Sequence, residues 1–97
     1  MFARLTTLSF RNDKFEEGVN LFKKSVVPAA RAQEGFQAIY LLVDREAGRC
    51  VAMTLWKDRA AAAANEQNRY YQEQLVKFLP FYTAPPIREG YDVAVKP

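Results

Sequence analysis

The sequence predicts an α+β fold in which four β-strands and two α-helices follow one another in the order β-α-β-β-α-β. Short segments rich in β-branched and aromatic residues carry the strand signal, and two longer segments repeat apolar residues every three or four positions. The chain has 97 residues, of which 49% are hydrophobic and 26% charged. Length and composition therefore indicate one globular domain that spans residues 1–97.

The first half of the chain begins with a strand and continues into a helix. Residues 2–10 alternate apolar and polar positions, which predicts the first strand. Asp13 and Glu16 then have the spacing of a capping box. An apolar stripe follows and predicts a helix through Phe15, Val19, Phe22, Val26 and Ala30. Pro28 is expected to kink or end this helix, and Gly35 closes the segment.

The middle of the chain predicts a β-hairpin. Residues 36–43 and 50–56 are apolar segments of strand length, and residues 44–48 between them have the composition of a turn. Gly48 is suited to the positive φ that such a turn requires. The second and third strands are therefore expected to pair with each other.

The second helix is predicted to begin after Asp58, which caps it, and to run for about twenty residues. Its inward-facing stripe consists of Ala64, Asn68, Tyr71, Leu75, Phe78 and Tyr82. Pro85 and Pro86 are expected to end the helical region, and residues 87–95 to form the fourth strand.

This order of elements is that of a ferredoxin-like four-stranded antiparallel sheet with two helices on one face. The second strand is apolar on both sides, with one set at Phe36, Ala38, Tyr40 and Leu42 and the other at Ile39, Leu41 and Val43. Two helices cover only one face of the sheet, so the other face requires a second apolar surface. We expect a homodimer in which the two sheets pack face to face.

Composition excludes several classes of function. The chain has no histidine and a single cysteine, Cys50, so a Ser-His-Asp triad, a Cys-His pair, a histidine-ligated zinc and a histidine haem ligand are excluded. We expect neither a metal nor a cofactor. No apolar run is long enough to span a membrane, and residues 1–7 lack the apolar stretch of a signal peptide, which favours a cytoplasmic protein.

Nucleic acid is not an expected partner. The net charge of +3 is small, and basic residues are interleaved with acidic ones. RNA-recognition motifs share this order of elements, but they stack bases on aromatics of the third strand. Residues 50–56 lack the basic-Gly-aromatic pattern of those motifs, which disfavours RNA binding.

Five short segments, in this order and spacing, resemble the antibiotic biosynthesis monooxygenase (ABM) family of the dimeric α+β barrel superfamily. They are Val27-Pro28-Ala29-Ala30-Arg31, Gly35-Phe36, Leu42-Val43-Asp44, Thr54-Leu55-Trp56-Lys57-Asp58 and Glu89-Gly90-Tyr91-Asp92-Val93. The resemblance covers about residues 2–96. It implies a homodimer with one pocket per subunit, between the sheet and its helices.

Family members with known activity are mostly cofactor-independent monooxygenases of quinol-like or anthrone-like aromatics, or enzymes that degrade haem. The first activity needs no metal, because an electron-rich phenolate or carbanion can itself reduce oxygen. Haem-degrading members use an asparagine on the first strand with a tryptophan and a histidine in the second helix. This chain has Arg4, Thr6 and Thr7 on that strand and no histidine, which disfavours haem as a substrate.

Three residues are the expected catalytic groups. Trp56 corresponds to the third-strand tryptophan of anthrone-type members, although Thr54 and Ala52 stand in the stretch where they carry an asparagine. Its indole N–H can donate to a quinone oxygen, or the ring can anchor the second helix. Asn68 is an amide on an apolar stripe, so it binds either substrate oxygen or the sheet edge. Tyr71 can stabilise an anion or fill core space.

Four further residues are expected to bind substrate, namely Arg4, Tyr40, Phe78 and Tyr82. Arg4 attracts an anionic substrate or forms a rim salt bridge to Asp44 or Glu89. Tyr40 is expected to face the same cavity as Tyr71.

Two other candidates have simpler interpretations. Cys50 is interpreted as a small core residue. Glu66 and Glu73 are interpreted as a solvated helix face. The function expected is therefore oxidation of a small aromatic by O2, and the alternative is a non-catalytic dimeric module that binds a small molecule or another protein.

Overall fold

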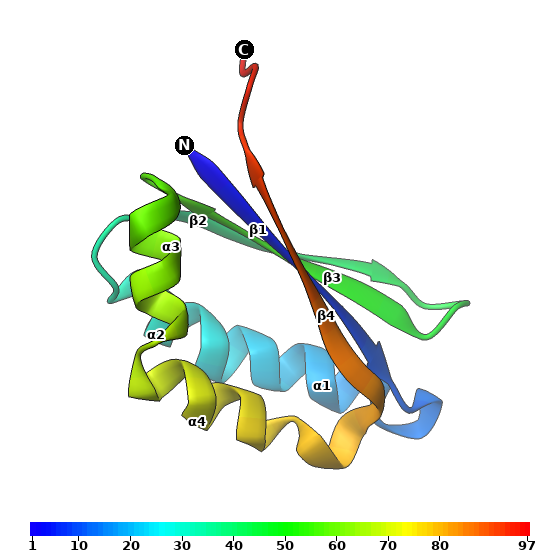
Figure 1. Cartoon of the computed structure of the whole chain (residues 1–97). Helices are drawn as coiled ribbons and strands as arrows, with labels where there is room; N and C mark the ends of the chain where they lie inside the picture. Colours follow the sequence, from blue (N-terminus) through cyan, green and yellow to red (C-terminus); the bar gives the residue numbers. More distant parts are fainter.

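The computed structural model describes residues 1–97 and contains one four-stranded antiparallel sheet with all helices on one face (Figure 1). The strands are β1 (Phe2–Phe10), β2 (Phe36–Asp44), β3 (Arg49–Trp56) and β4 (Tyr82–Asp92). Their order across the sheet is β2-β3-β1-β4, and every neighbouring pair is antiparallel. The predicted ferredoxin-like α+β fold is confirmed.

The first helical region is continuous but not uniform. A 3₁₀ turn, η1 (Asn12–Lys14), leads into α1 (Phe15–Leu21), a π-type turn η2 (Phe22–Val26) and α2 (Val27–Arg31). Pro28 neither ends nor breaks this region, because it lies in the first turn of α2. A proline removes one intrahelical hydrogen bond, and the wider π-type turn directly before it accommodates that loss.

The second helical region departs from the prediction of one long helix. It consists of α3 (Arg59–Glu66) and α4 (Arg69–Lys77), followed by a 3₁₀ turn, η3 (Leu79–Phe81). Asp58 caps α3 as predicted, since its Oδ1 accepts a hydrogen bond from the Ala61 amide at 2.8 Å. Asn68 interrupts the helix, because it has extended backbone and its side chain caps the next helix by accepting from the Tyr70 amide.

The fourth strand begins earlier than predicted. It starts at Tyr82 and ends at Asp92, so residues 93–95 lie outside it, whereas Tyr82 belongs to the sheet and not to a helix. Pro85 and Pro86 lie inside the strand. Because β4 is an edge strand, one side of its backbone needs no ladder partner, and the missing proline N–H groups are tolerated there.

The hairpin between β2 and β3 has the predicted turn. Gly48 adopts a φ of +65°, and a side chain at this position would lie 2.8 Å from Oδ1 of Asn12. Gly35 also has a positive φ, +82°, at the end of the segment after α2. Both glycines stand where the chain reverses direction, which is the reason that side-chain-bearing residues are disfavoured there.

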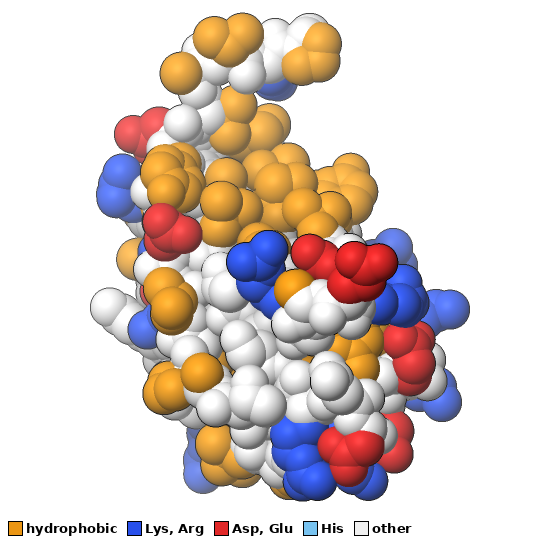
Figure 2. Space-filling model, turned by 90° about the vertical axis from the view of Figure 1, so that its right-hand side faces the viewer, with side chains coloured by type: hydrophobic (Ala, Val, Ile, Leu, Met, Phe, Trp, Pro, Cys, Tyr) orange, Lys and Arg blue, Asp and Glu red, His pale blue; other side chains and the backbone are white.

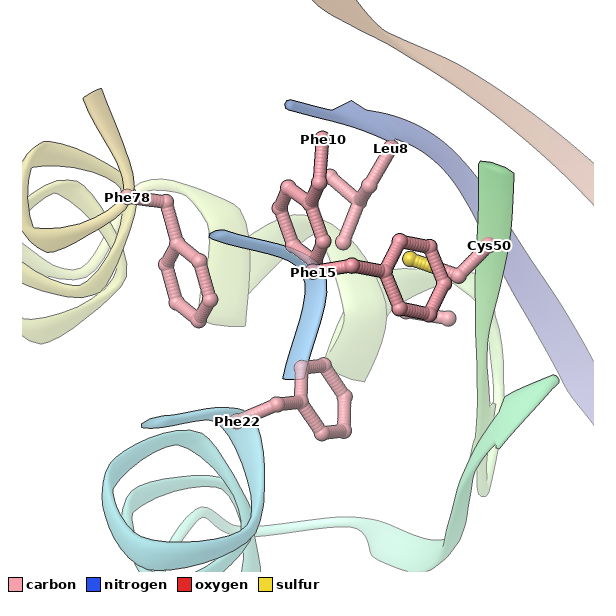
Figure 3. Packing of buried hydrophobic residues seen from close by; sticks show 7 residues of the cluster. Leu8, Phe10, Phe15, Phe22, Cys50 and Phe78 are labelled. Atoms are coloured by element: carbon pink, nitrogen blue, oxygen red, sulfur yellow. The ribbon is translucent and has the colours of Figure 1, made fainter. Parts of the chain in front are cut away.

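The larger core cluster lies between the helices and one end of the sheet (Figure 3). Phe10 is its centre, with 2% of its surface exposed and its ring stacked on those of Phe78 and Tyr82 at centroid distances of 5.8 and 6.0 Å. Phe15 meets the same ring edge-on. Gly18 allows α1 to approach, because a Cβ there would lie 2.7 Å from the Phe10 ring.

A smaller core cluster forms where α3 crosses the other end of the sheet. Phe2, Trp56 and Ala62 are its fully buried members. Phe36 packs edge-on against the Trp56 indole, with ring centroids 6.0 Å apart. This contact corrects the predicted grouping of the β2 side chains, in which Phe36 shared one face with Ala38, Tyr40 and Leu42. The pairing of β2 with β3 shifts between Phe36 and Ala38, so Phe36 faces the helices and Ala38, Tyr40 and Leu42 face away from them.

The sheet face opposite the helices is apolar and uncovered. The strand register places on it Ala3, Leu5, Thr7, Ala38, Tyr40, Leu42, Val51, Met53, Leu55, Ile87, Glu89 and Tyr91. Tyr40, Leu42, Ile87 and Tyr91 are each at least half exposed. In Figure 2, hydrophobic side chains gather in the upper part of the molecule, below the projecting C-terminal tail. We call this surface the open face. No helix combines the length and the hydropathy needed to span a membrane.

Replacing Phe10 with alanine should lower the free energy of unfolding by about 3–5 kcal/mol, because the substitution leaves a cavity among four aromatic rings. Urea unfolding followed by circular dichroism measures this change. Val95→Ala, at a residue that is 88% exposed, should change it by less than about 0.5 kcal/mol. Similar losses in the two variants would contradict the assignment of Phe10 as the centre of the core.

Candidate functional site

A small cavity lies between the sheet and its helices, beside the larger core cluster. Its volume is about 80 Å³. Residues from β1, β2, β3, η2, α4 and β4 line it, namely Thr6, Leu8, Phe22, Val26, Ile39, Ala52, Thr54, Tyr71, Leu75, Phe78 and Tyr82. The lining is apolar except for the hydroxyl groups of two threonines and two tyrosines. The chemical character of this lining, rather than its volume, matches a site for an apolar ring that carries few polar atoms.

Three of the predicted site residues meet at this cavity. Tyr71 contributes from α4, Phe78 from the end of that helix, and Tyr82 from the start of β4. Burial, together with the nearby Tyr71 and Cys50, raises the pKa of the Tyr82 phenol to about 12. The Tyr82 hydroxyl therefore stays protonated near neutral pH and can act as a hydrogen-bond donor.

A polar cluster adjoins the cavity at Tyr71. The Tyr71 hydroxyl accepts a hydrogen bond of 3.1 Å from Nη1 of Arg88, and this Nη1 also donates to Oε2 of Glu66 at 3.3 Å. On the other side of the carboxylate, Arg4 Nη2 lies 2.5 Å from Glu66 Oε1. The hydrogen bond to Tyr71 is the main reason that the pKa of Arg88 is raised above its ordinary value. We refer to Arg4, Glu66, Arg88 and Tyr71 as the arginine cluster.

The charges of the arginine cluster do not cancel. Two guanidinium groups face one carboxylate, which leaves one positive charge next to the Tyr71 hydroxyl. The carboxylate is largely shielded from water, because the Glu66 side chain is 19% exposed and that of Arg4 is 23% exposed. A guanidinium that already donates to a phenolic oxygen is suited to stabilise negative charge on an oxygen nearby.

The arginine cluster corrects two predictions. Arg4 forms a salt bridge, but to Glu66 and not to Asp44 or Glu89. Asp44 lies at the far end of β2 against Arg49, and Glu89 pairs with Leu5 on the open face. The interpretation of Glu66 as part of a solvated helix face was also wrong. Only Glu73 of that pair is well exposed, with 64% of its side chain accessible.

Gly90 makes room for the cluster. It pairs with Arg4 across the sheet, and a Cβ on Gly90 would lie 2.8 Å from Nη1 of Arg4 and 2.5 Å from the Phe2 ring. Arg4 and Arg59 both stack on that ring, with their guanidinium carbons 5.2 and 4.6 Å from its centroid. The missing side chain therefore lets the Arg4 guanidinium reach Glu66.

Three predicted site residues lie outside the cavity. Trp56 is 1% exposed and belongs to the smaller core cluster with Phe2 and Ala62. Asn68 was expected on a buried apolar stripe, but it is the exposed cap of α4, and its Nδ2 donates to Oε1 of Gln33 at 3.2 Å. Tyr40 was expected to face the cavity, but it is 52% exposed on the open face, because side chains alternate along β2.

Sequence reasoning did not include Arg88 among the site residues. It lies in a segment expected to be strand, with no local motif around it. The contact with Tyr71 spans 17 positions and the contact with Glu66 spans 22, so only the fold brings the three together. Cys50 is a core residue as expected, and burial raises the pKa of its thiol to about 11. No group of three or more Cys, Asp or Glu side chains is arranged to hold a metal ion.

The chain belongs to the antibiotic biosynthesis monooxygenase family, whose family model matches residues 1–74. Two uncharacterised proteins of Mycobacterium tuberculosis are similar to it in sequence. One is 31% identical over 67 residues, which cover 69% of this chain and 30% of the relative. The other is 32% identical over 65 residues, which cover 67% of this chain and 28% of the relative. The matched segment spans about 30% of the length of these curated relatives.

Solved structures show the same fold. A Nitrosomonas europaea protein with the provisional name antibiotic biosynthesis monooxygenase superposes with a TM-score of 0.82 at 19% identity, covering 98% of this chain and all of that one. A second protein of that organism, of unknown function, superposes with a TM-score of 0.84 at 16% identity. The match covers 99% of this chain and 91% of that one. A Deinococcus radiodurans protein with the same provisional name superposes with a TM-score of 0.82 at 14% identity. The match covers 99% of this chain and 95% of that one.

Glu66→Gln should lower the free energy of unfolding by about 1–3 kcal/mol, because it removes the counter-charge of the partly buried Arg4 guanidinium and of the more exposed Arg88 guanidinium. Urea unfolding at constant ionic strength measures the change. Glu73→Gln is the matched control on the exposed helix surface and should lower it by no more than about 0.5 kcal/mol. Equal losses of unfolding free energy in the two variants would show that the Glu66 carboxylate does not stabilise the arginine cluster.

Proposed function

We propose that the protein is a cofactor-independent monooxygenase that oxidises a small aromatic, quinol-like or anthrone-like substrate with molecular oxygen. One observation carries the proposal most directly. Tyr71 is one of four hydroxyl-bearing residues that line the largely apolar cavity, and its hydroxyl accepts a hydrogen bond from Arg88. Membership of the antibiotic biosynthesis monooxygenase family supports the same class of chemistry.

The reaction requires the protein to stabilise a substrate anion. An anthrone-like substrate loses a proton from its CH₂ carbon, and the resulting carbanion carries its charge largely on the conjugated carbonyl oxygen. Electron transfer to O₂ and recombination form a C–O bond to a hydroperoxide, which takes up the proton. Loss of water then breaks the O–O bond and leaves a quinone carbonyl. Both oxygen atoms and all four electrons are accounted for, because the substrate CH₂ becomes C=O and the second oxygen leaves as water.

The residues of the site match these requirements. The apolar lining removes water from the substrate, which strengthens electrostatic interactions inside the cavity. Tyr71, supported by the charge of Arg88, holds the substrate oxygen on which negative charge develops. The neutral Tyr82 phenol, whose pKa is raised to about 12, serves as a second hydrogen-bond donor within the same cavity.

A non-catalytic module that binds a small aromatic is the second candidate. Its support is the placement of Trp56 and Asn68, since two of the three residues expected to be catalytic do not line the cavity. Such a module would use the same apolar lining and the same arginine cluster, but it would release its ligand unchanged.

Oxygen uptake by the metal-free protein with a panel of hydroquinones and anthrones tests the proposed activity. Uptake should exceed the uncatalysed rate and fall at least about tenfold in Tyr71→Phe and Arg88→Met, which remove the anion-stabilising groups. Tyr40→Phe is the control, because it removes a phenolic hydroxyl from the open face. No uptake by the wild-type protein, together with saturable binding of the same compounds, would favour the binding module.

We also propose that the protein is a homodimer whose subunits pack through their open faces. The support is the extent of the apolar surface described above, which a monomer would leave in water. A two-fold axis would place the same strands of both subunits against each other, so a single apolar face serves both partners.

Leu42→Asp should convert the dimer into monomers, because it places a charge within the proposed apolar interface. Light scattering at micromolar concentration should give twice the 11.1 kDa chain mass for the wild-type protein and a single chain mass for the variant. Val76→Asp on α4, at a residue that is 60% exposed, should remain dimeric. A monomeric wild-type protein, or dissociation of both variants alike, would contradict the proposed interface.

A further inference from the structure

A larger groove lies directly outside the wall of the small cavity and is lined by residues of α4, η3 and the first half of β4. Its volume is about 560 Å³. The residues that line it are Gln72, Leu75, Val76, Leu79, Tyr82, Thr83, Ala84, Pro85 and Pro86. Leu75 and Tyr82 line both spaces, so these two side chains are the partition between the groove and the cavity.

The inner cavity alone is too small for the proposed substrates. An apolar cavity known to bind benzene has a volume of roughly 150 Å³, and the inner cavity has only about 80 Å³. The groove, in contrast, falls within the range of about 300–1,000 Å³ that is typical of ligand sites. A ring can therefore reach Tyr71 only if the partition moves and the two spaces become one.

The two sides of the partition are held by different contacts. The Tyr82 ring is stacked on Phe10 and Phe78, with centroid distances of 6.0 and 6.3 Å, which fixes it against the core. Leu75 belongs to α4, which has no fully buried residue. The helix is attached to η2 by polar contacts, since Ser25 Oγ donates to Gln74 Oε1 and accepts from Lys77 Nζ, both at 2.7 Å. Leu75 is therefore the side that can move outward.

The groove is apolar and exposed. Val76 and Leu79 are 60% and 63% exposed, although both are large hydrophobic side chains, and Pro85 and Pro86 form the opposite wall. No lysine, arginine, aspartate or glutamate lines the groove. This chemistry fits a hydrocarbon chain or an additional fused ring, and it does not fit a charged group.

We propose that Leu75 is a gate and that the groove is the outer half of one continuous binding site. This inference rests on the proposed function of the inner cavity and adds a substrate class to it. The substrate is an aromatic whose oxygen-bearing ring lies at Tyr71 and whose apolar extension, an alkyl chain or a further ring, lies along α4 and β4. Leu75 and Val76 thereby determine specificity for the extension, and Tyr71 and Arg88 determine it for the oxygen.

The test compares the binding of 1-naphthol and 4-hexyl-1-naphthol by fluorescence titration under nitrogen, so that turnover plays no part. The hexyl compound should bind at least about tenfold more tightly, because its chain is removed from water. Val76→Lys should abolish this difference and leave the affinity for 1-naphthol within about twofold. Val95→Lys is the matched control, since it places the same charge at an 88% exposed valine outside the groove.

The gate is tested separately with Leu75→Trp, which enlarges the partition. Association of both naphthols, followed by stopped-flow fluorescence, should slow at least about tenfold in this variant, because the gate opens less often. Equal affinities of the two naphthols for the wild-type protein, or an unchanged association rate in Leu75→Trp, would overturn the inference. A change of mass to monomer in Val76→Lys would do so as well, because it would show that a second copy covers the groove.

These outcomes are distinct from failure of the proposed function. Tighter binding of the hexyl compound without any oxygen uptake would leave the groove and the gate in place and would remove the oxygenase. Oxygen uptake with short hydroquinones that is unaffected by Leu75→Trp would retain the oxygenase and would remove the gate.

Discussion

The packing of Phe10 holds the sheet and both helical regions together. Its ring lies at the end of β1 and contacts rings that arrive from α1, from the end of α4 and from the start of β4. These elements are far apart in the chain and are joined here by dispersion and by removal of apolar surface from water. Gly18 belongs to the same arrangement, since it lets α1 come close enough for that ring to be enclosed. The cavity lies beside this cluster, between the sheet and α4.

The polar chemistry of the site depends on that apolar frame. Arg4, Glu66 and Arg88 come from β1, α3 and β4, and their charges would be screened if they lay on an open surface. Beside the largely apolar cavity, the excess positive charge acts on Tyr71 at short range. The same frame fixes Tyr82 by ring stacking and leaves Leu75 on the weakly held helix. Tyr82 is therefore fixed on one side of the cavity, and the side formed by α4, which carries both Tyr71 and Leu75, can yield to a ligand.

Local sequence signals predicted most of the fold and a smaller part of the site. Asp58 and Gly48 were placed correctly because capping and positive φ are decided by a few neighbouring atoms. Asn68 was misplaced because its position fits an apolar helix stripe, whereas its carboxamide instead ends one helix and begins the next. Pro85 and Pro86 were taken as the end of a helix, since only the assembled sheet shows that β4 is an edge strand where prolines are tolerated.

The sequence by itself determined the order of elements, the alternation of side chains along β1, the apolar character of both sides of β2 and the absence of any histidine chemistry. These properties follow from periodicity and composition, which the backbone geometry of each segment converts directly into facing. Only the tertiary structure decided that Arg88 and Glu66 meet Tyr71, that Tyr40 points away from them, and that a groove lies outside the cavity wall. The physical reason is the separation along the chain of the residues that decide each feature. Facing is fixed within a few residues, whereas an ion pair or a cavity requires the relative placement of elements that are many residues apart in the chain.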